Sequence, residues 1–412
     1  MQIGFTDRFG TGLALLDTDI EQLEVIATAS GVFLYAATGV NGGLTSWRLS
    51  ASDADPVLVD SAYFTAAMRG MDCLVLDAMT VGSTQRLIVG ATGSGALLGY
   101  DTGANGQIGA LSSSALNSRY SPGPQSGPCA LTAANGSHLV IVADAQTGAT
   151  NSYRVLDDGT MSIVASRASS WGVPSLGPVL LETVEIGSTQ LLLRADSALQ
   201  GVGSFLVTAS GGLQQLFTLG ASNGLGVNVP TALATVSAFG QTFVLLGAAE
   251  SGTISVMSLS ASGELRPTDH LLDTLDTRFD GITALETLVV DGRVFVIAGG
   301  ADDGLSLFTL LPDGRLVHLQ TLAQQSGYGL ENVQSISAVA LGDAIQIYVA
   351  SGAEAGLSHL SIDLAAMGAT VNGAASGSNR IDGTVLDDLL ISNSRGADTL
   401  YGGDGDDILV SG

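Results

Sequence analysis

A unit of about 52 residues is repeated seven times along the chain, and this repeat limits the possible folds more than any other feature. Each copy contains an apolar run that ends in small residues, such as VFLYAAT (32–38) or VFVIAGG (294–300), and a glycine follows shortly after. Successive glycines are 51 to 53 residues apart, at Gly43, Gly95, Gly148, Gly201, Gly252, Gly304 and Gly356. This regular spacing predicts a repeat architecture rather than a chain of unrelated domains.

Each unit predicts about four short strands. An apolar segment such as LEVIATA (23–29) precedes the run, and an alternating segment such as LTSWRLS (44–50) follows the glycine. A further strand often comes after an Asp-Gly turn, as in DDGTMSIVAS (157–166). No stretch has a convincing helical period. Four strands in a unit of this length are typical of a propeller blade.

The sequence therefore predicts an all-β fold, a seven-bladed β-propeller that spans residues 1–364. The last unit fades after its third strand, so we expect a strand within residues 3–18 to supply the outer strand of the last blade and close the ring. The alternative is an open β-solenoid with uncapped ends. The repeats have no WD or kelch motif, and they resemble the broad seven-bladed class that includes lactonase-type propellers.

The last part of the chain has a different character. Small and polar residues predict a linker at 365–380, and residues 381–412 then contain three nonapeptides in near register. GGDGDDILV (402–410) fits the pattern G-G-x-G-x-D-x-U-x at every fixed position. NSRGADTLY (393–401) and GTVLDDLLI (383–391) fit it in part, and the latter has Leu386 where the pattern has glycine.

These nonapeptides resemble the hemolysin-type calcium-binding repeat of RTX proteins. The resemblance implies that residues 381–412 are an incomplete RTX segment, the start of a parallel β-roll that binds Ca²⁺ between successive turns. It assigns the metal ligands to aspartate side chains and glycine carbonyls, at Asp388, Gly396, Asp398, Gly402, Gly403, Gly405 and Asp407. The missing glycine at Leu386 makes the first turn the weakest match.

The RTX resemblance also implies a compartment. RTX proteins are typically secreted by type I secretion machinery, so we expect an extracellular protein, which agrees with an N-terminus that has no Sec-type signal. Only two cysteines are present. Cys73 and Cys129 begin similar segments, and the sequence is compatible either with a disulfide between them or with two buried thiols.

Composition excludes several classes of function. The net charge is −25, which argues against nucleic-acid partners and against attraction to anionic membranes. The chain has no lysine, so P-loop and Schiff-base chemistry are excluded. No apolar run approaches the length of a membrane span.

The propeller itself has no convincing catalytic motif. GASNG (220–224) matches G-x-S-x-G but leads into a loop, and no histidine has an evident serine or carboxylate partner. Loops expected on one face contain carboxylates and aromatics, at Asp144, Asp196, Glu250, Asp302, Asp303, Glu354, Tyr63, Phe64, Tyr120, Trp171, Phe279 and Tyr328, together with Arg69, Arg119 and Arg278. We therefore expect a non-catalytic binding module for extracellular glycans or proteins. The alternative is a lactonase- or glycosidase-like hydrolase with its site at the central channel.

Overall fold

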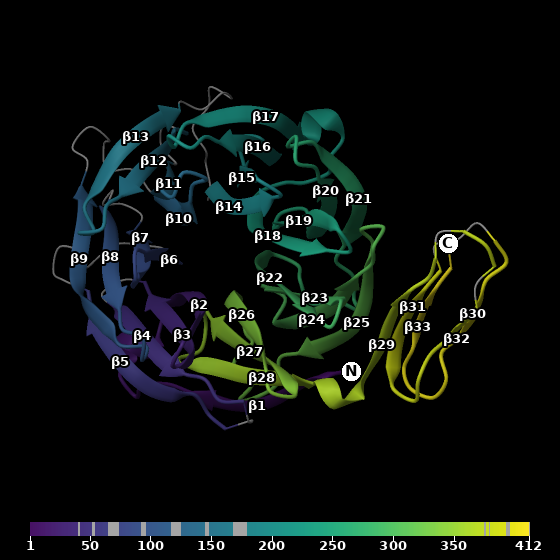
Figure 1. Ribbon diagram of the computed structural model, residues 1–412. Coiled ribbons are helices and arrows are strands. Elements are labelled where there is room, and N and C mark those ends of the chain that lie inside the picture. The colour runs from purple at the N-terminus through teal and green to yellow at the C-terminus, as the bar shows by residue number, and fades with distance from the viewer. Residues whose placement is uncertain are drawn as a thin grey trace.

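The computed structural model describes residues 1–39, 42–51, 54–64, 74–91, 96–116, 125–144, 148–167, 179–374, 376–378, 380–392 and 396–411. Seven four-stranded antiparallel sheets are arranged radially around one axis, so the predicted seven-bladed propeller is confirmed (Figure 1). The helical segments are single turns, α1 (Ala14–Asp17), η1 (Ala221–Asn223) and η2 (Leu364–Ala366). No helix among these residues is long and apolar enough to cross a membrane.

The blades follow one another in sequence, and each begins with its innermost strand. Blade 1 contains β2 (Ile20–Thr28), β3 (Gly31–Thr38), β4 (Gly43–Arg48) and β5 (Val57–Tyr63). Blade 2 contains β6 (Leu74–Val81), β7 (Thr84–Ala91), β8 (Ala96–Thr102) and β9 (Ile108–Leu116). Blade 3 contains β10 (Gln125–Thr132), β11 (His138–Asp144), β12 (Thr150–Val155) and β13 (Met161–Arg167). Blade 4 contains β14 (Val179–Ile186), β15 (Thr189–Asp196), β16 (Gly201–Val207) and β17 (Leu213–Gly220).

The remaining blades repeat this order. Blade 5 contains β18 (Pro230–Ala238), β19 (Gln241–Ala248), β20 (Thr253–Leu259) and β21 (Leu265–Leu272). Blade 6 contains β22 (Ile282–Val290), β23 (Arg293–Gly300), β24 (Gly304–Leu310) and β25 (Leu316–Ala323). Blade 7 contains β26 (Val333–Leu341), β27 (Ala344–Ser351) and β28 (Leu357–Asp363), and β1 (Ile3–Phe9) is its outer strand. The predicted closure by an N-terminal strand is therefore confirmed, with Ile3 opposite Ile362.

The apolar runs of the repeat are the second strands, which are buried on both faces. All eight residues of β23 are buried, and so are six of the eight in β3. Their side chains pack between neighbouring blades, as Phe33 and Tyr35 of blade 1 pack with Leu87 and Val89 of blade 2. Because each blade buries both faces only against its neighbours, the closed ring has no exposed terminal blade.

The tail forms two short parallel sheets. One contains β29 (Met367–Asn372), β31 (Asp387–Ile391) and β33 (Ile408–Val410), and the other contains β30 (Arg380–Asp382) and β32 (Thr399–Tyr401). The chain alternates between the two sheets, each successive strand lying in the other sheet. The expected linker at 365–380 therefore differs from the structure, since β29 lies within it and pairs with β31. The small residues of segment 365–380 therefore lie both in a strand and in the connections beside it.

The tail packs against blade 6. Leu389 and Ile391 of the tail form an apolar cluster with Leu311 of the propeller. The Arg293 side chain is only 1% exposed, and its Nη2 donates to the carbonyl oxygen of Asp387 at 2.9 Å. Burial lowers the pKa of Arg293, and the nearby Asp387, Asp388 and Asp407 oppose that effect.

Candidate active site in the central channel

Four of the seven innermost strands place a carboxyl group at the same position of the repeat. Glu24 is in β2, Asp77 in β6, Glu182 in β14 and Glu286 in β22. These residues are separated by one, two and two repeat units. In a propeller with this topology the innermost strands surround the central axis, as Figure 1 shows for all seven. The four side chains thus form a ring, which we call the channel carboxyls, from blades 1, 2, 4 and 6.

The next blade holds three of the four channel carboxyls. Asp77 Oδ2 accepts a hydrogen bond from the Ala130 amide at 2.5 Å. Glu182 Oε1 accepts from Thr235 Oγ1 at 3.1 Å, and Glu286 accepts from the Ala338 amide. Glu24 differs, because within the part of the chain that is described nothing donates to its carboxyl group.

The environment raises the pKa of every channel carboxyl. Burial is the main cause each time, and it raises the pKa of Asp77 to about 6, of Glu182 to about 7 and of Glu286 to about 8. Burial also holds the pKa of Glu24 well above its usual value, and Asp77, Glu286 and Glu182 raise it further. The four side chains keep some accessible surface. The pKa values of the channel carboxyls are raised because protein surrounds the four side chains on all sides, although these side chains keep some contact with water.

The described innermost strands offer no cation to balance these groups. The seven innermost strands contain no arginine, lysine or histidine. Several carboxyl groups so close together cannot all ionise near neutral pH, so some stay protonated while others are charged. The ring therefore offers proton donors and acceptors at once, which general acid–base chemistry requires.

Sequence reasoning missed these four residues, although a signal was present. Each is an acidic residue within the apolar segment that begins a unit, as in LEVIATA (23–29) and PVLLETV (178–184). A carboxyl in an otherwise apolar innermost strand departs from the pattern of its segment. Superposing the seven segments by their repeat position would have placed the four acids at one level.

The loop residues expected to form a ligand face are instead part of the framework. Phe279 is fully buried and packs edge-on against Phe308, Phe64 is buried, and Tyr328 stacks on Phe5 with ring centroids 4.4 Å apart. They fill gaps between blades because a flat aromatic ring covers much apolar surface there. The predicted residues Arg69, Arg119, Tyr120 and Trp171 lie outside the described residues.

The acidic loop residues mostly form local contacts. Asp196 is buried with Arg194, whose Nη2 is 2.8 Å from Asp196 Oδ2. Asp302 pairs with Arg278 at 3.3 Å, and Glu354 pairs with Arg8 at 3.5 Å. Asp303 Oδ1 accepts from the Asn332 amide and Glu250 Oε2 from Asn228 Nδ2. These carboxylates therefore hold loops and neighbouring blades together.

The remaining sequence motifs do not build a nucleophile. GASNG follows β17 and contains only the single turn η1, so the strand–turn–helix of a nucleophile elbow is absent at these residues. One histidine does have a serine partner, contrary to expectation, since His270 Nδ1 is 2.9 Å from Ser255 Oγ. Ser255 is fully buried, so a substrate cannot reach it. Cys129 is a free, buried thiol whose pKa burial raises, and Cys73 lies outside the described residues.

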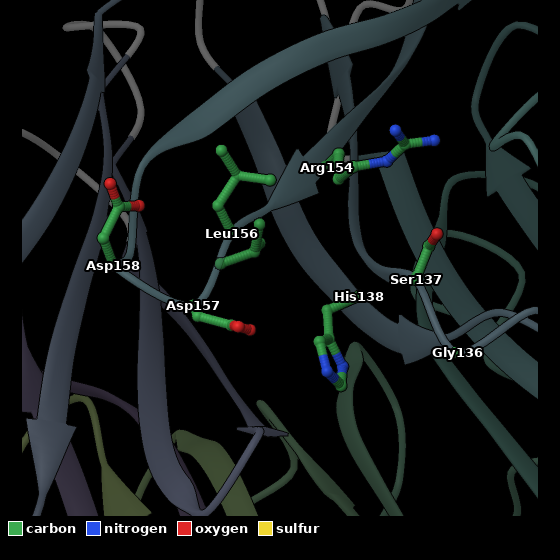
Figure 2. Close-up of a pocket in the computed structure, with 8 residues that line it drawn as sticks. Gly136, Ser137, His138, Arg154, Leu156, Asp157 and Asp158 are labelled. Atoms are coloured by element: carbon green, nitrogen blue, oxygen red, sulfur yellow. The ribbon is translucent and has the colours of Figure 1, made fainter.

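An open pocket of about 490 Å³ lies at the periphery of blade 3, between the β10–β11 and β12–β13 turns (Figure 2). Its ionisable lining residues are His138, Arg154, Asp157 and Asp158. In Figure 2 the Arg154 guanidinium points away from both aspartates. Asp158 is fixed within its own turn by Thr160, and these hydrogen bonds lower its pKa. The pocket is therefore a weaker candidate than the channel, where raised pKa values and converging groups coincide.

The tail stacks the turns expected to bind calcium. Asp407 Oδ1 accepts from the Asp388 amide at 2.9 Å, so the turns after β30 and β32 lie side by side. Gly403 and Gly405 have φ values of 109° and 111°, and a Cβ at Gly403 would lie 2.0 Å from the Thr384 carbonyl oxygen. A Cβ at Gly402 would lie 1.9 Å from Asp407 Oδ2. Only glycine leaves this space between carboxylate and carbonyl oxygens.

The other predicted ligands lie in the neighbouring turns. Asp388 is fully buried, and its carboxylate accepts from the Ala369 amide and from Thr384, which stabilises the turn that has Leu386 instead of glycine. Asp398 accepts from Ser392 Oγ, and a Cβ at Gly396 would lie 2.0 Å from the Gly377 carbonyl oxygen. Across the described ranges no three His, Cys, Asp or Glu side chains gather as a metal site. Two aspartates and backbone carbonyls are nevertheless oxygen donors of the kind that Ca²⁺ takes.

Comparisons with solved structures agree with the propeller. A proposed 6-phosphogluconolactonase from Bacteroides fragilis has a TM-score of 0.57 and 10% identity, over 81% of this chain and 96% of that one. The periplasmic gluconolactonase of Pseudomonas aeruginosa has a TM-score of 0.51 and 17% identity, over 82% and 95%. A protein from Lactobacillus plantarum has a TM-score of 0.52 and 16% identity, over 84% and 96%. At these identities the likeness establishes a shared seven-bladed fold.

No protein-family model matches the chain, and no curated protein matches it. The expectation of a non-catalytic binding module is wrong: the similar propellers include lactonases, a finding that fits the hydrolase alternative better. The physical reason lies in the aromatic residues, since those that are described pack between blades and do not rim a binding face, apart from Tyr63, which is 48% exposed.

Proposed function

We propose that this protein is a propeller hydrolase that opens lactones in its central channel. The observation that carries the proposal is the ring of four channel carboxyls with raised pKa values, set at one level by four blades. Titratable groups with such shifts are typical of catalytic sites. The likeness to lactonase propellers supports the choice of a lactone as the substrate.

Asp77 and Glu24, from adjacent blades, are the proposed base and acid. The pKa of Asp77 is about 6, so at pH 7 its carboxylate can accept a proton from water. The water oxygen then bonds to the lactone carbonyl carbon. Burial holds the pKa of Glu24 well above its usual value, and its carboxyl group donates a proton to the ring oxygen as the C–O bond breaks. The product is a hydroxy acid, and exchange with solvent restores both groups.

Glu182 and Glu286 have a different proposed role. With pKa values of about 7 and about 8, the Glu182 carboxyl is about half protonated at pH 7 and the Glu286 carboxyl is mostly protonated. A protonated carboxyl both donates and accepts hydrogen bonds, which suits the hydroxyl groups of a sugar lactone. Thr235 and the Ala338 amide fix their orientation. We therefore assign them to substrate positioning.

The test of this function is a hydrolysis assay on the purified full chain. Glucono-1,5-lactone and a simple aliphatic lactone are supplied, and acid release is followed by pH-stat against the spontaneous rate. The proposal predicts saturable hydrolysis well above that rate, with typical kcat values of about 1–10³ s⁻¹. Rates equal to the blank, or turnover of nitrophenyl glycosides alone, would contradict it.

We also propose that the tail binds Ca²⁺ as an RTX segment, and that the protein acts outside the cell, where calcium is plentiful. The stacked glycine turns support this proposal, because carboxylate and carbonyl oxygens converge there. Asp388 and Asp407 would hold Ca²⁺ between the turns after β30 and β32, together with the carbonyls of Gly402, Gly403 and Gly405. Asp398 and the carbonyl of Gly396 would hold it in the turn after β31. The bound ion would join neighbouring turns, since metal binding and folding are coupled.

Calorimetric titration with CaCl₂ checks the calcium proposal. The chain is expected to bind with a dissociation constant of about 0.1–1 mM, as extracellular modules do, and Asp407→Asn is expected to weaken uptake at least several-fold. Asp404→Asn is the control, since this exposed side chain lies in the same turn and its backbone carbonyl is kept. No uptake by the parent chain, or equal uptake by both variants, would overturn the proposal.

A further inference from the structure

The charge of the channel indicates which substrates it accepts. Its seven innermost strands contain six acidic residues, Glu21, Glu24, Asp77, Glu182, Glu185 and Glu286, and no basic residue. The chain also has no lysine. Binding of a phosphate in a protein usually relies on Arg, Lys or a helix N-terminus. None of the described innermost strands offers any of these.

The described arginines near the propeller faces already form contacts outside the channel. Arg194 is paired with buried Asp196, and Arg278 is paired with Asp302. Arg293 lies beneath the tail. A guanidinium already paired with a carboxylate is a poor partner for a second anion, because binding would leave the first carboxylate unpaired.

From this charge distribution, and resting on the proposed function, we infer that the channel hydrolyses uncharged lactones and rejects phosphorylated ones. A phosphate monoester has a charge of about −1.5 to −2 at pH 7. Bringing it beside ionised carboxylates in a channel walled by protein is unfavourable, because low-dielectric walls focus the field. An uncharged lactone meets no such barrier.

The same field acts on the product. Hydrolysis converts a neutral lactone into a hydroxy acid, whose carboxyl group is ionised at neutral pH. The new carboxylate then lies among the channel carboxyls without a cation, so repulsion favours its release. Selection against anionic substrates and release of an anionic product therefore have the same physical cause.

The experiment compares initial rates for glucono-1,5-lactone and its 6-phosphate, each corrected for spontaneous hydrolysis, at low and high salt. We expect kcat/KM to favour the neutral lactone by at least about ten-fold at low salt. Added salt is expected to narrow the gap by raising only the rate with the 6-phosphate, because screening weakens repulsion. Equal or faster hydrolysis of the 6-phosphate overturns the inference. Hydrolysis of neither lactone overturns the proposed function itself.

A charge-removing variant separates repulsion from a purely steric exclusion. At pH 8 the Glu182 carboxyl, with a pKa of about 7, is mostly ionised. Glu182→Gln keeps the shape of the side chain and removes this channel charge, so at pH 8 the ratio of kcat/KM values for the two lactones should fall several-fold, whatever its effect on the rates themselves. Glu264→Gln makes the same change at an exposed site paired with Arg266 and should leave the ratio unchanged. A ratio that Glu182→Gln does not alter would contradict the electrostatic origin of the selectivity.

Discussion

Replacing Glu24 by glutamine or Asp77 by asparagine is expected to lower kcat for lactone hydrolysis by about 10²–10⁴-fold, the usual contribution of a general acid or base. Both substitutions keep the shape of the side chain and remove its ability to transfer a proton. The Asp77 carboxylate accepts from the Ala130 amide, which the Oδ1 of asparagine can still do, so the fold should be retained. Steady-state kinetics with glucono-1,5-lactone measures the loss.

The pH dependence of kcat/KM adds a second readout to this prediction. The acid limb of the parent profile should lie near the Asp77 pKa of about 6, because protonation of the base stops the reaction. Glu185→Gln is the control, since Glu185 is an exposed glutamate on an innermost strand, three residues after Glu182. If Glu24→Gln and Asp77→Asn both keep the activity and pH profile of the parent, the acid–base assignment is wrong.

The second large effect concerns stability, which is expected to fall as the pH rises from about 4.5 to about 8. A carboxyl whose pKa is raised on folding holds its proton more tightly in the native state than in the unfolded chain. Stability is then highest below the unfolded pKa and decreases until the folded pKa is passed. Glu286, with a pKa of about 8 against 4.5, has the largest shift that is assigned a value.

Glu286→Gln should therefore stabilise the protein at high pH. At 1.36 kcal/mol for each pKa unit, the gain above pH 8 is on the order of 5 kcal/mol, with little difference at pH 5. Urea unfolding at pH 5, 7 and 9 measures the change. Glu185→Gln should have no comparable effect, since this side chain is exposed. A parent protein whose stability rises steadily between pH 5 and pH 8 would contradict the raised pKa values.

Much of the fold could be predicted because the geometry of a propeller blade requires a recognisable pattern of apolar and polar residues in the sequence. A second strand buried on both faces is mostly apolar, and residues 294–300 of β23 form an unbroken apolar run for this reason. The last unit lacked a fourth strand, and a closed ring required one from elsewhere, which β1 supplies. These features depend on the local residue pattern and on the number of strands in each unit, and both can be read from the sequence.

The candidate site could not be predicted in the same way, because it depends on side chains from different blades that come together only in the folded ring. Glu24 and Glu286 are separated by five repeat units in sequence, and only closure of the ring brings them close enough to influence each other's pKa. The prediction for Phe279 is wrong for the opposite reason. An aromatic in a loop has the same local pattern whether it binds a ligand or, as here, packs against Phe308.

The tail shows a further limit of pattern reading. Residues 367–372 have the small and polar composition of a linker, yet they form β29 because β31 and Arg293 satisfy their backbone groups. No local property of this segment distinguishes the two outcomes. Docking against blade 6 is a tertiary effect, which the sequence of the segment does not encode by itself.

A crystal structure with a neutral, non-hydrolysable lactam analogue of the substrate tests the central claim most directly. The account predicts that the lactam lies in the central channel at the level of the channel carboxyls, with its carbonyl and ring nitrogen between Glu24 and Asp77. A lactam bound instead in the peripheral pocket beside His138 and Asp158, with the channel holding only water, would contradict it.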